Sequence, residues 1–166
     1  VRRIENSYPC LTTVSITETL ADMRTVKSPG EVECIRRAVA NARAGIEAMM
    51  ASVRPGMHEY ELQAVCYNLL HRRGEMKAGP MVASGGNAVI LHYPQANATI
   101  REEDLVLIDF CPRHNHYASD ISRAFPSDGR FSTRQRDLYR IGLEANKQMI
   151  ESVTAGMTFR QMNEMA

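Results

Sequence analysis

Two apolar segments on either side of a short polar stretch each carry an aspartate, and no other feature constrains the fold as much. Asp109 ends residues 105–109, and Asp120 lies within residues 117–125. Aspartate is depleted in β-strands, yet both segments otherwise have the composition of strands. The polar stretch between them, residues 112–116, is short, so we predict that the two segments pair as a β-hairpin.

The spacing of the two aspartates suggests how they meet. A turn centred between His114 and Asn115 would place Asp109 directly opposite Asp120. Directly opposed side chains have Cβ atoms about 4.5–5.5 Å apart, and like charges there are destabilising. A divalent cation held by both carboxylates would offset the repulsion. The alternative is a different register in which one aspartate faces solvent, and the spacing alone leaves both open.

The first predicted helix has a well-defined start. Ser28 and Glu31 form a capping-box pattern around Pro29, which suits a first helical turn. Apolar residues then recur at spacings of three and four to about Val53, as in an amphipathic helix. Residues 1–27 have no clear period, and we interpret them as a linker or tail from a preceding domain, or as a short strand and linker.

More elements are predicted between this helix and the hairpin. A second helix covers about residues 58–73, with Gly74 as its C-terminal cap. Residues 81–83 and 89–91 are predicted to be strands on either side of the turn-forming residues 85–87. The region therefore changes from helical to extended at about residue 80.

The end of the chain repeats the pattern of its beginning. Ser132 and Thr158 each precede a glutamine by three residues, which predicts capped helices to about Val153 and to the last residue. Residues 52–57 also resemble residues 152–157, at an offset of 100. If the repeat is real, the second unit has its first helices and lacks its strands.

Charge and composition exclude several classes of protein. Lys and Arg total 20 and Asp and Glu total 19, without the basic excess that binding to nucleic acid requires. No apolar run approaches the roughly 18 residues of a membrane helix. The cysteines form no CxxC pair, so we interpret them as scattered thiols of a reducing compartment. We expect a cytoplasmic protein that binds neither nucleic acid nor membranes.

Three motifs in order along the chain resemble metallopeptidase family M24, most of all its Xaa-Pro aminopeptidase and prolidase branch. They are Ile90-Leu91-His92-Tyr93, Leu107-Ile108-Asp109 and Ser119-Asp120-Ile121-Ser122-Arg123. The resemblance covers about residues 22–166. It implies an α+β pita-bread fold, with residues 28–166 as the first half of the catalytic domain plus the first helices of the second half.

The resemblance also implies roles for individual residues. Asp109 matches the ligand that chelates one metal ion, and Asp120 matches the carboxylate that bridges two. His92 matches the active-site histidine that assists proton transfer or steadies the tetrahedral intermediate. The family takes a histidine and two glutamates from its second half, which would follow residue 166, so we expect the chain by itself to be an inactive fragment.

The implied activity is hydrolysis of the peptide bond between an N-terminal residue and proline, with two divalent ions. Mn²⁺ is the expected ion, and Co²⁺, Zn²⁺ or Fe²⁺ are alternatives. The expected partners are a peptide with proline second and further copies of the chain, because the missing half would leave an apolar face exposed. The rival functions are a non-catalytic pita-bread module that binds peptides or proteins, and a creatinase-like C–N hydrolase. The two aspartates favour the peptidase.

The chain departs from the family pattern beside the first aspartate. Cys111 stands where the family commonly has glycine, and His116 stands where a glycine often precedes the tyrosine of the second strand. Because Asp109-Phe110-Cys111-Pro112 resembles a variant within the family, we do not interpret these differences as loss of the site.

Overall fold

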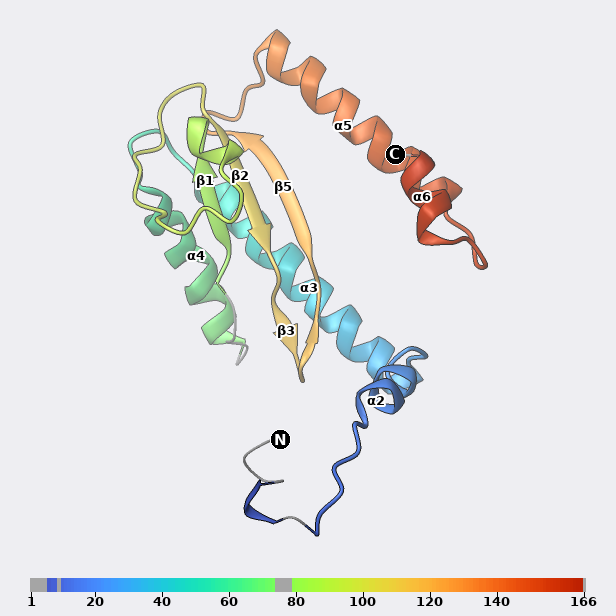
Figure 1. Cartoon of the computed structure of the whole chain (residues 1–166). Coiled ribbons are helices and arrows are strands. Elements are labelled where there is room, and N and C mark those ends of the chain that lie inside the picture. Colours follow the sequence, from blue (N-terminus) through green and yellow to red (C-terminus); the bar gives the residue numbers. More distant parts are fainter. Residues whose placement is uncertain (1–5, 9, 74–78, 166) are drawn as a thin grey trace.

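The computed structural model describes residues 6–8, 10–73 and 79–165. A three-stranded antiparallel sheet in the order β1-β2-β5 has α3 and α4 on one face, and α5 and α6 lie beyond β5 (Figure 1). The bounds are α2 Thr17–Met23, α3 Pro29–Ser52, α4 Glu59–Arg72, β1 Met81–Ser84, the 3-10 helix η1 Gly85–Val89, β2 Leu105–Phe110, β3 Arg113–His114, β4 Tyr117–Ala118, β5 Ile121–Pro126, α5 Thr133–Ser152 and α6 Phe159–Met165. None of the described helices is both long enough and apolar enough to cross a bilayer.

The helix starts predicted from capping patterns are confirmed. At α3, Ser28 Oγ accepts from the backbone N–H of Glu31 at 3.3 Å, and the Glu31 carboxylate accepts from the backbone N–H of Ser28 at 2.6 Å. Ser132 and Gln135 make the same reciprocal pair at α5, at 3.3 and 2.9 Å. Each pair satisfies two N–H groups that have no partner inside the helix, so the local sequence determines where the helix begins.

Other local predictions had mixed outcomes. The predicted strand at residues 89–91 is wrong, because η1 includes Val89 and a bend and turn follow it. Val89 and Leu91 are 87% and 86% exposed, and β1 pairs with β2 instead. Helix α2 lies within the region interpreted as a linker. Gly74, the predicted cap of α4, falls outside the described residues.

The hairpin between β2 and β5 exists as predicted, but its register differs by two residues. Asp109 is opposite Ser122 rather than Asp120. The cause is the turn, in which Asn115 and His116 have φ angles of 46° and 71°. Two successive positive φ angles are typical of the tight hairpin turn whose twist matches that of the strands, and asparagine tolerates this conformation well. The turn is therefore centred one residue later than the sequence suggested.

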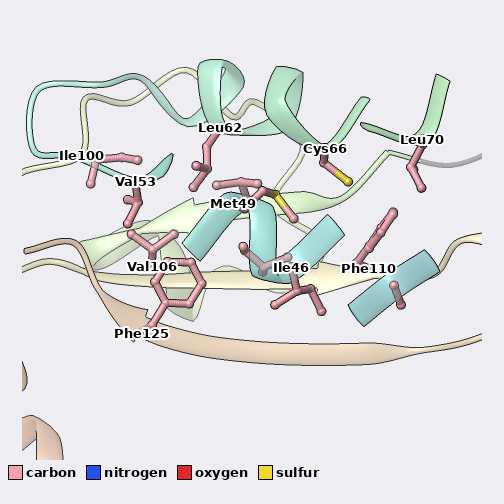
Figure 2. Packing of buried hydrophobic residues seen from close by; sticks show 13 residues of the cluster. Ile46, Met49, Val53, Leu62, Cys66, Leu70, Ile100, Val106, Phe110 and Phe125 are labelled. Atoms are coloured by element: carbon pink, nitrogen blue, oxygen red, sulfur yellow. The ribbon is translucent and has the colours of Figure 1, made fainter. Parts of the chain in front are cut away.

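The core lies between the sheet and the helices α3 and α4. Figure 2 shows Met49, Leu62, Val106 and Phe110 meeting there, and all four are fully buried. In β2 the buried residues alternate with partly exposed ones. Since successive side chains of a strand point to opposite faces, Val106 and Phe110 face the helices. Asp109 therefore lies on the other face of the sheet.

The two ends of the repeat adopt the same conformation. Gly56 and Gly156 have φ angles of 93° and 95°, a region that favours glycine. Val53 and Val153 each donate a backbone hydrogen bond to the carbonyl four residues earlier, at 2.9 and 3.1 Å. The repeat is therefore real in this turn. The units differ in packing, because α3 buries one face against the sheet and α5 buries no residue.

Candidate metal centre

The first aspartate is held by a neighbour across the sheet. Asp109 lies in β2 and is partly buried. Its cross-strand partner, Ser122, donates a hydrogen bond from Oγ to Asp109 Oδ1 at 3.1 Å. This bond orients one oxygen of the carboxylate on the face of the sheet that points away from α3 and α4.

The second aspartate lies directly before β5 and has its own neighbour. The Cys111 thiol donates to Asp120 Oδ1 at 3.2 Å. The residues between the two paired segments, β2–β5 and β3–β4, keep the same register. There the backbone N–H of Ser119 donates to the carbonyl of Pro112 at 3.1 Å. Cys111 and Asp120 are therefore opposite each other, next to the Asp109–Ser122 pair on the same face.

These two cross-strand pairs bring the aspartates together diagonally. Asp109, Cys111 and Asp120 each offer a ligand atom, and these atoms all lie within 4.8 Å of one another. Among the described residues this is the one group of three His, Cys, Asp or Glu side chains gathered in this way. The predicted convergence of the carboxylates is thus present, although their direct opposition is wrong.

The thiol of Cys111 is protonated at neutral pH. Burial raises its pKa, as do the hydrogen bond to Asp120 and the charges of Asp120 and Asp109, and together they bring it to about 11. Without a cation the thiol therefore acts as a hydrogen-bond donor to Asp120. Two carboxylates and one sulfur are a donor set that fits part of a divalent cation site.

His92 lies on the same hollow as the first aspartate. The hollow, of about 270 Å³, is lined by both His92 and Asp109, together with Ser122 and Leu107 from the sheet. His92 is exposed and has a φ angle of 52°. It does not belong to the three-residue ligand group, and it comes from the segment after η1 rather than from the sheet.

Glu59 is a buried acid that the sequence analysis missed. It is 0% exposed, at the first position of α4. Its Oε1 accepts from the Ser84 N–H at 2.7 Å, the Ser84 hydroxyl at 2.8 Å and Asn87 Nδ2 at 3.2 Å, and its Oε2 accepts from the Ala98 N–H at 3.1 Å. Burial alone would raise the pKa of Glu59, but the bonds from Ser84, Asn87 and Ala98 outweigh it and hold the pKa below its usual value.

These bonds fix both ends of the segment that carries His92. Asn87, which precedes His92, also donates from Nδ2 to the Tyr93 hydroxyl at 3.0 Å. Ala98 follows His92 and Tyr93 in the chain. Glu59 therefore ties the helix layer to the residues on either side of His92. One signal could have revealed this role, because Glu59 precedes Leu62 by three positions and so lies on the apolar stripe of α4.

The sequence of this chain is similar to those of known metallopeptidases. Residues 33–166 match the family model for metallopeptidase family M24. A Xaa-Pro aminopeptidase of Haemophilus influenzae is 36% identical over 150 residues, which are 87% of this chain and 34% of that protein. A Xaa-Pro dipeptidase of Pyrococcus furiosus is 31% identical over 153 residues, 91% of this chain and 44% of that protein.

Solved structures give the same result for the fold. A Bacillus anthracis protein described as an aminopeptidase P superposes with a TM-score of 0.93 at 34% identity, covering 99% of this chain and 40% of that one. A variant of Escherichia coli aminopeptidase P in complex with substrate gives 0.87 at 33% identity, covering 92% and 35%. The predicted α+β pita-bread architecture is confirmed as a partial one, since the chain spans between about a third and under half of these relatives.

Proposed function

The chain belongs to metallopeptidase family M24, and we propose that the protein containing it hydrolyses the peptide bond between an N-terminal residue and a following proline. The observation that carries the proposal is the convergence of Asp109 and Asp120 on one face of the sheet, with His92 on the adjoining hollow. The similarity to Xaa-Pro aminopeptidases and a Xaa-Pro dipeptidase supports the substrate class. A module that only binds peptides has no need of converging carboxylates, which cost electrostatic energy.

Asp109 and Asp120 are the proposed ligands of the divalent ions. When bound, such ions lower the pKa of a water molecule and polarise the scissile carbonyl. Ser122 donates a hydrogen bond to Asp109, and a neighbour of this kind orients a metal ligand. The Cys111 thiol donates to Asp120. Mn²⁺ is the ion that the family resemblance favours, in keeping with the oxygen donors of the two carboxylates.

His92 has a separate task in this proposal. The residue lines the hollow beside Asp109 without being part of the ligand group. An imidazole in that position can donate a hydrogen bond from its ring N–H to the oxygen on which negative charge develops, or pass a proton to the departing nitrogen. As in the hydrolysis of any amide, the departing nitrogen must gain a proton as the bond breaks.

The test is a peptidase assay on the full-length protein with Ala-Pro and Ala-Pro-Ala as substrates and Ala-Ala-Ala as the control peptide. We expect metal-dependent release of alanine from the proline peptides. The Asp120→Asn variant should lose several orders of magnitude in kcat, whereas Asp137→Asn, at an exposed position on α5, should match the wild type. Full turnover by Asp120→Asn, or by the wild type in excess chelator, would overturn the proposal.

The 166-residue chain assayed alone is expected to be inactive. Asp109 and Asp120 supply fewer donors than the about six that Mn²⁺-type ions prefer. The assay uses the purified chain with Mn²⁺ in excess, together with its mass in solution. Metal-dependent cleavage by a verified monomer would mean that the active site lies elsewhere in the chain.

A further inference from the structure

The thiol of Cys111 occupies a position from which it can contact the same ion as the two aspartates. Cys111 follows Asp109 by two residues, directly after β2, so both side chains lie on the same face. Its Sγ is 3.2 Å from Asp120 Oδ1, and it lies within 4.8 Å of the nearest contributing oxygen of Asp109. The sulfur is thus one of the three candidate ligand atoms of the group.

These separations are close to what shared coordination requires. In zinc sites the metal–sulfur distance is about 2.3 Å and the metal–oxygen distance about 2.0–2.2 Å, so a sulfur and an oxygen on one ion are at most about 4.5 Å apart. The Cys111–Asp120 separation already falls inside this limit. The group of three needs only a small adjustment to place all its ligand atoms around one ion.

Comparison with a second cysteine separates this role from ordinary packing. Cys66 is fully buried in the core, and burial alone raises the pKa of its thiol to about 12. Its environment is the apolar cluster around Met49 and Phe110, and burial is the one cause that raises its pKa. Cys111 is instead only partly buried and is bonded to an aspartate. A core-filling function explains Cys66 but not Cys111.

We propose that Cys111 is a third ligand of this centre and shifts its preference from Mn²⁺ towards Zn²⁺ and Co²⁺. The inference rests on the proposed metal centre. Thiolate ligands favour Zn²⁺ over Mn²⁺, whereas carboxylates alone suit Mn²⁺. On binding, the thiol would release to solvent the proton that it donates to Asp120, and the sulfur would then be available as a ligand of the ion.

The test is the absorption spectrum of the full-length protein titrated with Co²⁺, because a cobalt–sulfur bond produces an intense near-ultraviolet charge-transfer band and oxygen ligands do not. We expect this band together with weaker visible ligand-field bands in the wild type and in the control Cys34→Ser. In Cys111→Ser and Cys111→Gly the charge-transfer band should disappear while the visible bands persist. Two variants are used because one of them could fold poorly, and the wild-type spectrum is decisive without either.

The outcomes distinguish this inference from the proposed function. Visible bands without the charge-transfer band in the wild type would overturn the role of Cys111 and leave the carboxylate centre intact. Absence of any Co²⁺ binding would overturn both. A second measurement compares Zn²⁺ and Mn²⁺ affinities by competition with a chelating dye. The ratio of Zn²⁺ to Mn²⁺ affinity should fall by at least roughly tenfold in Cys111→Ser, and an unchanged ratio would contradict the proposal.

Discussion

Asp109 pairs across the sheet with Ser122, whose hydroxyl donates a 3.1 Å hydrogen bond to the aspartate. The next pair on the same face, Cys111 and Asp120, has the same arrangement of one donor and one carboxylate. Each acid thus has a cross-strand neighbour that orients it, and the like charges are diagonal rather than directly opposed. The offset reduces the repulsion that direct opposition would cause.

Removing the Ser122 hydroxyl tests whether its hydrogen bond to Asp109 contributes to metal affinity. Ser122→Ala should weaken metal affinity of the full-length protein by roughly 10–100-fold, the usual effect of losing a hydrogen bond to a ligand. Ser122 is exposed, so folding should be unaffected. Isothermal titration calorimetry measures the affinity, with the exposed Ser152→Ala as control. Equal affinities in all three proteins would remove Ser122 from the centre.

Replacing the buried acid should affect both stability and the loop of His92. In Glu59→Gln an amide N–H₂ replaces one acceptor oxygen and meets a donor, either Ala98 N–H or the Ser84 groups. The expected loss is about 1–3 kcal/mol in the free energy of unfolding, with kcat reduced and metal affinity retained. Urea unfolding and steady-state kinetics check this, with Glu33→Gln as an exposed control on α3. A fully active, fully stable variant would show that Glu59 does not position the loop.

The Tyr117 hydroxyl couples the hairpin to the start of α3 in a pH-dependent way. It donates to Glu31 Oε1 at 2.6 Å, and this bond, followed by those from Ser28, lowers the pKa of Glu31 from 4.5 to about 2. A lowered folded-state pKa means that the stabilisation is present above pH 4.5 and is lost as the pH falls towards 2. Tyr117→Phe should therefore raise the pKa of Glu31 and make stability less sensitive to acid in that range.

Two measurements check the coupling between Tyr117 and Glu31. Nuclear magnetic resonance titration follows the Glu31 carboxyl, and denaturant unfolding at several pH values follows stability. Tyr60→Phe, on the exposed side of α4, is the control. An unchanged pKa for Glu31 in Tyr117→Phe would mean that the bond does not persist in solution.

The close approach of α3 to its neighbours depends on Gly45. A Cβ there would lie 2.8 Å from Cys66 Sγ and 2.9 Å from a ring carbon of Phe110. Gly45→Ala should therefore destabilise the fold by about 1–3 kcal/mol through overpacking. Gly142→Ala, in α5 with nothing within 4 Å of the new Cβ, should be neutral or stabilising. Urea unfolding measures the free energy of unfolding of both variants. Equal values for Gly45→Ala and Gly142→Ala would contradict the packing argument.

Features determined by near neighbours in sequence were predictable. The capping pairs at Ser28 and Ser132 involve residues three positions apart, and both helix starts were predicted correctly. The strand prediction at residues 89–91 failed because pairing depends on a distant partner, and β2 is what pairs with β1. The composition of an apolar run does not determine which strand it pairs with.

The candidate site was predictable to a similar extent. The sequence predicted that Asp109 and Asp120 would converge, and they do, while their role as ligands stays a prediction. The register was missed because it depends on the φ angles of Asn115 and His116. Glu59 was missed because an acid in the first turn of a helix is usually a favourable surface residue, and only the tertiary structure buries it.

The tight turn at Asn115 and His116 has a consequence for the order of folding. It joins β3 to β4, which continue the pairing of β2 with β5. Pairing β2 with β5 therefore closes a shorter loop than pairing β1 with β2 across residues 85–104. Short loops lose less chain entropy on closure and form faster. We therefore expect the two acids to meet early in folding, before Glu59 can order the segment of His92.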